Sequence, residues 1–398
     1  MHGRLCSELL LDRGRWASLG IVTIFCVSSP NSLSAQVTGT VALEGAGYSA
    51  QPQTTLDPLE FALSFDAALS LMTGDEEFEL RAEPFLRLDP TGERSRVDMT
   101  VLSLTALSET WEMSIGFADL AWGVSESRHL VDGVNQRDLV GPGSGYLRMG
   151  QLTASLTAIR PWGTVDAMLL PWFRERRFDG RAGLLWSPLP VDPSRTSWAE
   201  GAKEWRLDWA LRWNHTLGPV DIAVSHLQGN LREPGFVEIA DDELAGVLAP
   251  RYSLGGQTGV EFQAVTGRWI VKVEALSANP EPGRYLAVAG GVEYSVAQYL
   301  GLFLEYAWDS RGGTALTSFQ DDFFLGGRLL LPDGQARAAA YVDRKQGNLV
   351  LTLEADRRLG NAFVLGIAAG AFIGDASEEP ILARRQQTGL SLRLSRFF

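Results

Sequence analysis

Residues 203–214 place an apolar side chain at every second position from Trp205 to Trp213. This period of two is typical of a β-strand, whose successive side chains point to opposite faces, and no amphipathic helix shares it. One face would carry three tryptophans and the other would carry charges, namely Glu204, Arg206, Asp208 and Arg212. A β-sandwich core strand has the same period, but this charged face is too polar to pack against a second sheet. Lipid can cover the tryptophan face without further protein, so the stretch predicts a strand in contact with lipid.

The last eleven residues, 388–398, show the same alternation of apolar and polar side chains. Leu390, Leu392 and Leu394 alternate with polar residues, and Phe398 follows. In hydrocarbon every backbone N–H and C=O must find a partner, so strands there must close into a barrel. The stretch resembles the terminal signal of bacterial outer-membrane barrels, which end on an aromatic residue with apolar residues at every second position before it. Arg396 stands at one of these apolar positions, so either it snorkels to the interface or the register counts from Phe397.

Alternating segments separated by turn residues recur along the chain, and no helical period persists. We expect an all-β fold, a transmembrane antiparallel up-and-down β-barrel of about 18 strands (16–18), with short periplasmic turns and longer extracellular loops. The predicted strands are 37–48, 59–71, 77–88, 95–106, 110–122, 146–159, 162–172, 203–215, 219–229, 251–265, 268–278, 285–296, 300–309, 322–331, 335–343, 348–357, 361–373 and 387–398. The long connections (123–145, 173–202, 230–250, 310–321 and 374–386) fall on one side of this arrangement, as a barrel requires.

The first 35 residues have the features of a cleaved secretory signal peptide. Arg13 and Arg15 precede the apolar run from Trp16 to Val27, and cleavage is expected before Gln36. The run is shorter than the roughly 20 residues that a spanning helix needs. Both cysteines of the chain lie in this segment, so the mature chain would form no disulfide, and we expect no lipid anchor. Residues 36–398 would then form a single barrel domain in the bacterial outer membrane, reached by export through the periplasm.

The charge of the chain argues against nucleic acid as a partner. The formal net charge is −13, and residues 1–35 carry three arginines against one glutamate and one aspartate, which leaves −14 for residues 36–398. The partners that we expect are outer-membrane lipid, small polar solutes or ions, and the barrel-assembly machinery, which would contact the C-terminal strand.

Barrel width favours a channel, because about eight strands fill with side chains whereas about 16 to 18 leave an aqueous lumen. Fewer than 25 residues separate the predicted cleavage site from the second strand, too few for the globular plug of an energy-coupled receptor. On the charged face of residues 203–214, Arg206 and Arg212 would line the lumen, with Glu204 and Asp208 beside them. Such a ladder of alternating sign would favour polar or charged solutes over apolar ones.

Residues 122–140 contain the most specific motif of the chain. Trp122 and Gly123 end a predicted strand, and Asp132, Asn135, Asp138 and Leu139 follow in the loop. This arrangement resembles a family of largely uncharacterised bacterial outer-membrane porin-like proteins, in which a strand ends on Trp-Gly and a loop of the form Asp-x-x-Asn-Pro-x-Asp-Leu follows; here Gln136 replaces the proline. The resemblance implies passive transport of small polar solutes, with no cofactor.

This loop has two interpretations that the sequence leaves open. It could fold into the lumen and narrow it, with Arg128, Asp132, Asn135, Arg137 and Asp138 as constriction residues. Alternatively, its Asp and Asn side chains could cap backbone N–H groups and hold it at the rim. The spacing of its oxygen-bearing side chains is not that of a calcium loop, and we expect no metal.

An outer-membrane enzyme or adhesin on the same barrel is the alternative function, and a secreted soluble β-protein is the third. Ser225 and His226 are adjacent in a predicted strand, so their side chains point to opposite faces and cannot form a nucleophile–base pair. Ser127 and His129 share the loop and could approach one another, although ordinary loop polarity explains them as well. We therefore expect a channel and not an enzyme.

Overall fold

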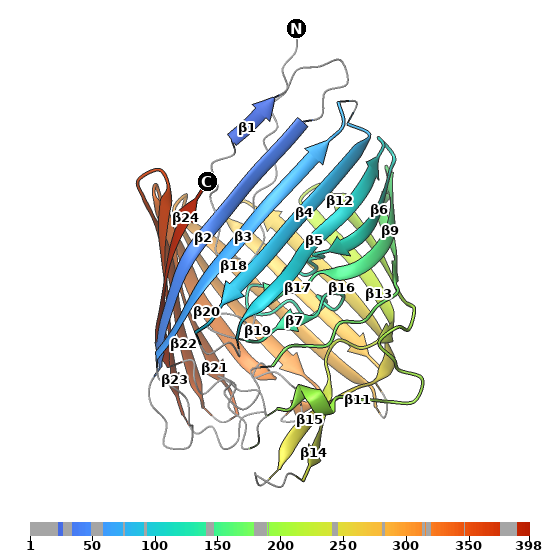
Figure 1. The fold of residues 1–398 in the computed structure, drawn as a ribbon. Helices are drawn as coiled ribbons and strands as arrows, with labels where there is room; N and C mark the ends of the chain where they lie inside the picture. The colour runs from blue at the N-terminus through green and yellow to red at the C-terminus, as the bar shows by residue number, and fades with distance from the viewer. Residues whose placement is uncertain are drawn as a thin grey trace.

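The computed structural model describes residues 23–26, 34–48, 59–74, 76–90, 94–140, 147–178, 189, 191–240, 246–280, 283–312, 315, 320–345, 347–374 and 388–398. Among these residues, eighteen antiparallel strands pair in chain order and form a closed barrel (Figure 1). They are β2 (Ser34–Tyr48), β3 (Leu59–Met72), β4 (Phe78–Leu88), β5 (Arg96–Leu107), β6 (Trp111–Ala118), β9 (Gln151–Arg160), β10 (Gly163–Leu170), β12 (Asp208–Leu217), β13 (Val220–Asn230), β16 (Leu254–Thr266), β17 (Trp269–Ala278), β18 (Tyr285–Ala297), β19 (Leu300–Asp309), β20 (Asp321–Leu331), β21 (Gly334–Asp343), β22 (Leu349–Leu359), β23 (Phe363–Ile373) and β24 (Gly389–Phe397). The predicted fold class and strand number are confirmed.

The seam of the barrel joins its last strand to its first. β24 pairs with β2 from Tyr48↔Gly389 to Thr40↔Phe397. Beyond this ladder, Gly39 and Phe398 exchange two backbone hydrogen bonds of 3.1 Å. A Cβ atom on Gly39 would lie 2.2 Å from the Phe398 ring, so a larger residue there would displace the terminal aromatic ring. Arg396 is exposed on the same face as Leu390, Leu392 and Leu394, which settles the register as counting from Phe398.

The connections differ in length between the two ends of the barrel, as predicted. One end carries tight turns, for example 161–162, 218–219 and 267–268. The C-terminus lies at this end (Figure 1). The opposite end carries the long connections, and beyond it projects a small sheet of β11 (Ser197–Trp198), β14 (Gly235–Ile239) and β15 (Val247–Tyr252). A second two-stranded sheet pairs β7 (Arg137–Asp138) with β8 (Leu147–Arg148).

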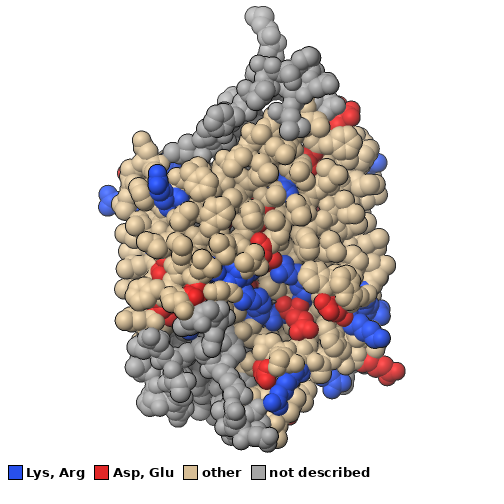
Figure 2. All heavy atoms as spheres, viewed as in Figure 1, with Lys and Arg blue, Asp and Glu red and all other residues tan. Residues whose placement is uncertain are grey.

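The outer surface of the barrel is apolar around its circumference. Large apolar side chains are exposed on strands from every part of the barrel, including Leu43, Phe61, Leu104, Ile115, Leu169, Leu211, Leu304, Leu353 and Leu390. Figure 2 shows one face, on which charged side chains gather toward the long-loop end and the band above them is almost free of charge. A soluble protein rarely exposes so large an apolar surface, whereas a transmembrane barrel needs such a belt, about 25 Å tall.

Several predicted strand limits are wrong, among them the start of the predicted strand 37–48, which begins at Ser34. The predicted strand 203–215 begins only at Asp208, because residues 203–207 form a turn in which the N–H of Arg206 donates to the C=O of Lys203. The alternation of apolar and polar residues therefore includes residues 203–207, although strand pairing begins only at Asp208. The predicted strands 110–122 and 146–159 shrink to β6 and β9 because the residues between them form a long loop, and the predicted strand 251–265 begins at Leu254 because β15 pairs with β14 instead.

The predicted signal peptide lies largely outside the described residues. Of residues 1–35, only 23–26 and 34–35 are described, and β1 (Thr23–Cys26) pairs with the start of β2. Cleavage before Gln36 remains a prediction. The described part of the chain contains no helix with the length and apolarity to cross a membrane.

Replacing Leu392 by arginine should prevent assembly of the barrel. Leu392 is exposed on the apolar face of β24, where a charge at mid-bilayer costs roughly 2–4 kcal/mol. Heat-dependent mobility in SDS gels measures the folded fraction. The matched control is Ser391→Arg, which places the same side chain on the opposite face of β24. Equal yields of folded barrel from the two variants would contradict the assignment of the faces.

Candidate functional site

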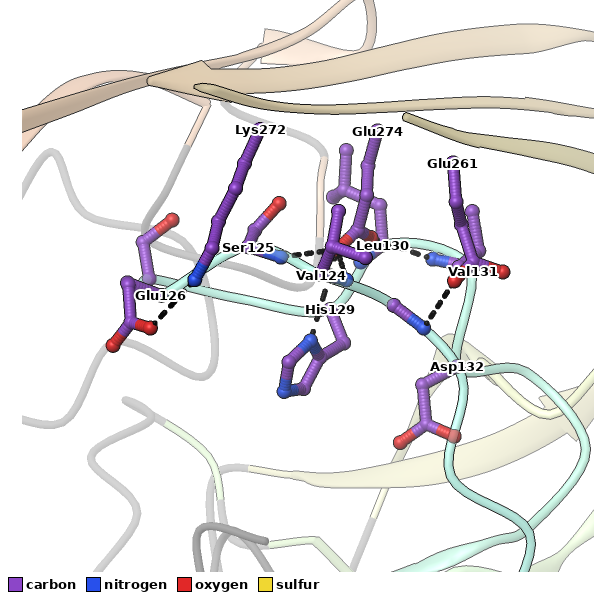
Figure 3. Close-up of polar contacts among 12 residues, drawn as sticks. Val124, Ser125, Glu126, His129, Leu130, Val131, Asp132, Glu261, Lys272 and Glu274 are labelled. Atoms are coloured by element: carbon purple, nitrogen blue, oxygen red, sulfur yellow. Dashed lines mark hydrogen bonds and ion pairs between the residues drawn. The ribbon is translucent and has the colours of Figure 1, made fainter. Parts of the chain in front are cut away.

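The loop after β6 enters the barrel and contacts the inner walls of strands far away in the sequence (Figure 3). We call residues 119–140 the inward loop. The walls present three glutamates to it: Glu261 on β16, Glu274 on β17 and Glu305 on β19. Each glutamate is buried and directly follows an exposed apolar residue (Val260, Val273 and Leu304), so the period of two places the carboxylates inside the barrel. The loop therefore lies against the inner wall, as the first interpretation expects, and its role as a constriction remains a prediction.

Glu274 holds the centre of the inward loop. Its Oε1 atom accepts hydrogen bonds from the backbone N–H groups of Val124 (2.6 Å) and Ser125 (2.7 Å), and its Oε2 atom accepts those of Leu130 (2.6 Å) and Val131 (3.2 Å). The side chain of Glu274 is fully buried. Hydrogen bonds to a charged group contribute about 1.5–3 kcal/mol each, so this single carboxylate can fix two turns of the loop against the wall.

The other two glutamates fix the loop on either side of Glu274. Glu261 accepts the N–H of Gly123 at 3.0 Å and also receives the guanidinium of Arg212, with contacts of 3.0 to 3.2 Å. Glu305 accepts the N–H groups of Glu126 (2.6 Å) and Ser127 (2.8 Å). The loop is thus attached to three strands through its backbone.

Apolar packing completes the attachment. The buried residues of this cluster are Trp122, Val131 and Val134 of the loop, Leu231 after β13, and Met168, Leu170, Ala210 and Leu227 from the inner faces of β10, β12 and β13. The contact with β16 is close enough to require glycine, because a Cβ atom on Gly259 would lie 2.6 Å from Val131 Cγ1. The part of the inner wall that the loop covers is therefore apolar. The inner face of a strand in contact only with water would carry polar side chains instead.

The predicted motif residues hold the loop in shape. Asn135 is buried, donates to the carbonyls of Ala118 and Met149, and accepts the N–H of Leu120. Gln136, which occupies the position of the family's proline, is also buried and donates to the carbonyl of Arg232.

The two predicted loop aspartates are each shared between arginines. Asp132 pairs with Arg137 (3.1 Å) and Arg148 (3.0 Å). Asp138 pairs with Arg96 (2.6 Å) and Arg177 (3.1 Å). Because Asn135 and the two aspartates have separate partners, they do not converge on one site. The described residues contain no group of three His, Cys, Asp or Glu side chains that could hold a metal.

Arg128 of the inward loop meets the connection after β13. It lies 3.5 Å from Glu233, which also pairs with Arg311 at 2.5 Å. Burial by itself would raise the pKa of the Glu233 carboxyl, but Arg311 and then Arg128 outweigh burial and lower this pKa. Glu233 therefore remains ionised at neutral pH.

The predicted ladder on residues 203–214 is only partly formed. The side chain of Arg212 lies inside the barrel and forms an ion pair with Glu261. Its guanidinium is 5.7 Å from the centroid of the Trp122 ring. Asp208 begins β12 and binds Arg232 at 2.9 Å. Glu204 and Arg206 lie in the turn before β12, where Glu204 accepts the indole N–H of Trp172, so the prediction that these two residues belong to the strand is wrong.

Neither of the two Ser–His pairs considered from the sequence forms a nucleophile–base pair in the structure. Ser127 Oγ is buried and has no hydrogen-bond partner among them, so it does not pair with His129 as a nucleophile would. Ser225 and His226 stand opposite Arg212 and Leu211 of β12, on the two different faces of the wall.

Sequence reasoning did not identify Glu261, Glu274 and Glu305 as the attachment sites of the loop. A signal for the loop's position was nevertheless present. The inner-face positions Met168, Leu170 and Leu227 are apolar, although a wall that faces only water would carry polar side chains there.

Two bacterial porin structures were found to be similar to the chain. Pseudomonas aeruginosa OccK5 (OpdH) aligns with a TM-score of 0.54 and 10% identity over 92% of this chain and 97% of that chain. A mutant of the Rh. blastica porin aligns with a TM-score of 0.45 and 9% identity over 92% of this chain and 100% of that chain. No protein-family model and no curated protein matches the chain. The likeness to OccK5 shows a shared barrel fold.

Replacing Glu274 by glutamine should release the inward loop. The amide keeps one acceptor oxygen but points an NH₂ group at two of the four backbone donors, so opening should increase about tenfold or more. Limited digestion with trypsin, followed by mass spectrometry, reports cleavage after Arg128. The matched control is Glu79→Gln, which removes a carboxylate from β4 that contacts Ser70 and Arg81. Equal cleavage rates in Glu274→Gln and the native chain would contradict the role given to Glu274.

Proposed function

We propose that the protein is an outer-membrane porin-like channel for the passive diffusion of small polar solutes or ions. The observation that carries this proposal is the inward loop, which the three wall glutamates hold inside a closed barrel of eighteen strands. A barrel of about this strand number encloses more space than its side chains fill, and a loop attached inside it narrows that space to a constriction.

Charge on the constriction supports polar solutes as the cargo. Arg128, Asp132, Arg137 and Asp138 belong to the inward loop or its edge, and Arg212 lies on the wall beside it. Arg212, Asn214 and Asp221 also line a cavity of about 190 Å³ next to Val124 of the loop. Polar and charged groups around a narrow passage favour polar permeants over apolar ones.

Location and assembly belong to the same proposal. The apolar belt supports residence in a membrane, and the predicted signal peptide supports export through the periplasm to the outer membrane. β24 would engage the barrel-assembly machinery through its exposed apolar side chains at alternate positions and through Phe398. The structural roles of Gly123, Asn135 and Asp138 support the resemblance to porin-like proteins with the Trp-Gly and Asp-x-x-Asn loop, because these residues shape the inward loop.

The folded protein should form discrete ion-conducting channels in a planar lipid bilayer. Stepwise current increases of uniform size are expected after addition of heat-modifiable barrel, since the lumen would connect the two sides. The same preparation, boiled before addition, is the control. A correctly folded barrel that inserts into the bilayer but conducts no current would overturn the proposed function.

A further inference from the structure

Three cations on the inner wall converge on one residue of the inward loop, Glu126. Lys272 Nζ on β17 lies 2.9 Å from Glu126 Oε1, and Arg328 Nη2 on β20 lies 2.7 Å from Glu126 Oε2. Arg337 Nη2 on β21 lies 3.5 Å from the same Oε2 and donates to the backbone carbonyl of Glu126 at 2.9 Å. Figure 3 shows Glu126 at the tip of the loop with Lys272 reaching down to it. Three strands of the wall thus supply one cationic site.

The loop carboxylate offsets part of the positive charge of this site. Lys272 also pairs with Glu293, so two carboxylates meet three cations. Burial by itself would raise the pKa of Glu126, but Lys272 and then Arg328 outweigh burial and lower this pKa to about 2. Glu126 is therefore an ionised carboxylate at any physiological pH. Without its side chain, three cations would face one carboxylate.

Two of the three wall cations are accessible to water, and aromatic rings hold one of these two in position. The side chain of Arg328 is 36% exposed and that of Arg337 is 26% exposed, so water reaches both. Arg337 lies over the rings of Phe303 and Phe324, 5.3 Å from each centroid, and both rings are buried. Cation–π contacts of this kind hold a guanidinium in place and reduce the ordering cost of binding a ligand.

We propose that Lys272, Arg328 and Arg337 form a binding site for the anionic oxygen group of a solute, a carboxylate or a phosphate, and that Glu126 is its internal competitor. The proposal rests on the proposed channel function for its physiological meaning. The backbone of Glu126 is held separately, through its N–H to Glu305. Rotation of the Glu126 side chain alone would therefore vacate the site while the loop stays in place.

Binding is measured by calorimetry on the folded barrel in detergent at constant ionic strength, with succinate and with inorganic phosphate as separate probes. Replacing Glu126 by glutamine removes the competing charge and keeps the shape, so this variant should bind at least one probe about tenfold or more tightly than the native chain. The probe with the larger gain identifies the group that the site prefers. Glu79→Gln, which removes a carboxylate on β4 that contacts Ser70 and Arg81, should bind as the native chain does.

A double variant, Glu126→Gln with Arg328→Gln, separates site binding from general attraction to a more positive lumen. It should lose the gain of the single variant. Unchanged affinity in Glu126→Gln, or an equal gain in the double variant, would overturn the proposed site. Conductance measured on the same proteins is independent of this result, so a barrel that binds the probe but conducts no current would remove the channel function and leave the site standing.

Discussion

A strand wall in lipid can leave no backbone N–H or C=O unpaired, and the other features of this structure follow from that constraint. It requires β24 to return to β2, and the exchange of hydrogen bonds between Gly39 and Phe398 carries the pairing to the last residue. Closure at eighteen strands creates an interior too wide for the wall side chains to fill. The interior therefore has room for a segment of the chain itself.

The inward loop meets the same requirement by other means. Before β7, its backbone lies inside the barrel without a neighbouring strand, so the N–H groups of residues 119–136 need acceptors from elsewhere. Glu261, Glu274 and Glu305 supply these acceptors, and the apolar inner faces of β10, β12 and β13 supply packing area. A buried carboxylate is costly when alone, but one that accepts four N–H groups is well compensated. The wall and the loop thus depend on one another.

Local patterns allowed the fold to be predicted, whereas contacts distant in sequence escaped prediction. Alternation identified the apolar face of the most regular strands, and turn residues marked the short connections, because both signals depend on neighbouring residues. The prediction from alternation failed at Glu204 and Arg206, where apolar and polar residues still alternate although β12 begins only at Asp208. The path of the inward loop stayed open because its acceptors lie far along the chain: Gly123 is 138 residues from Glu261, and Ser127 is 178 residues from Glu305. No spacing rule connects such positions.

Under the proposed function, the inward loop sets the width of a water-filled passage. Liposome swelling with uncharged sugars of increasing size measures that width directly, for the native chain and for a variant in which residues 124–134 are replaced by a short Gly-Ser linker. If the loop sets this width, the variant admits larger sugars than the native chain. Both proteins should show the same heat-dependent mobility shift in SDS gels, which confirms that both barrels are folded. An identical size limit in the two proteins would contradict this role of the loop.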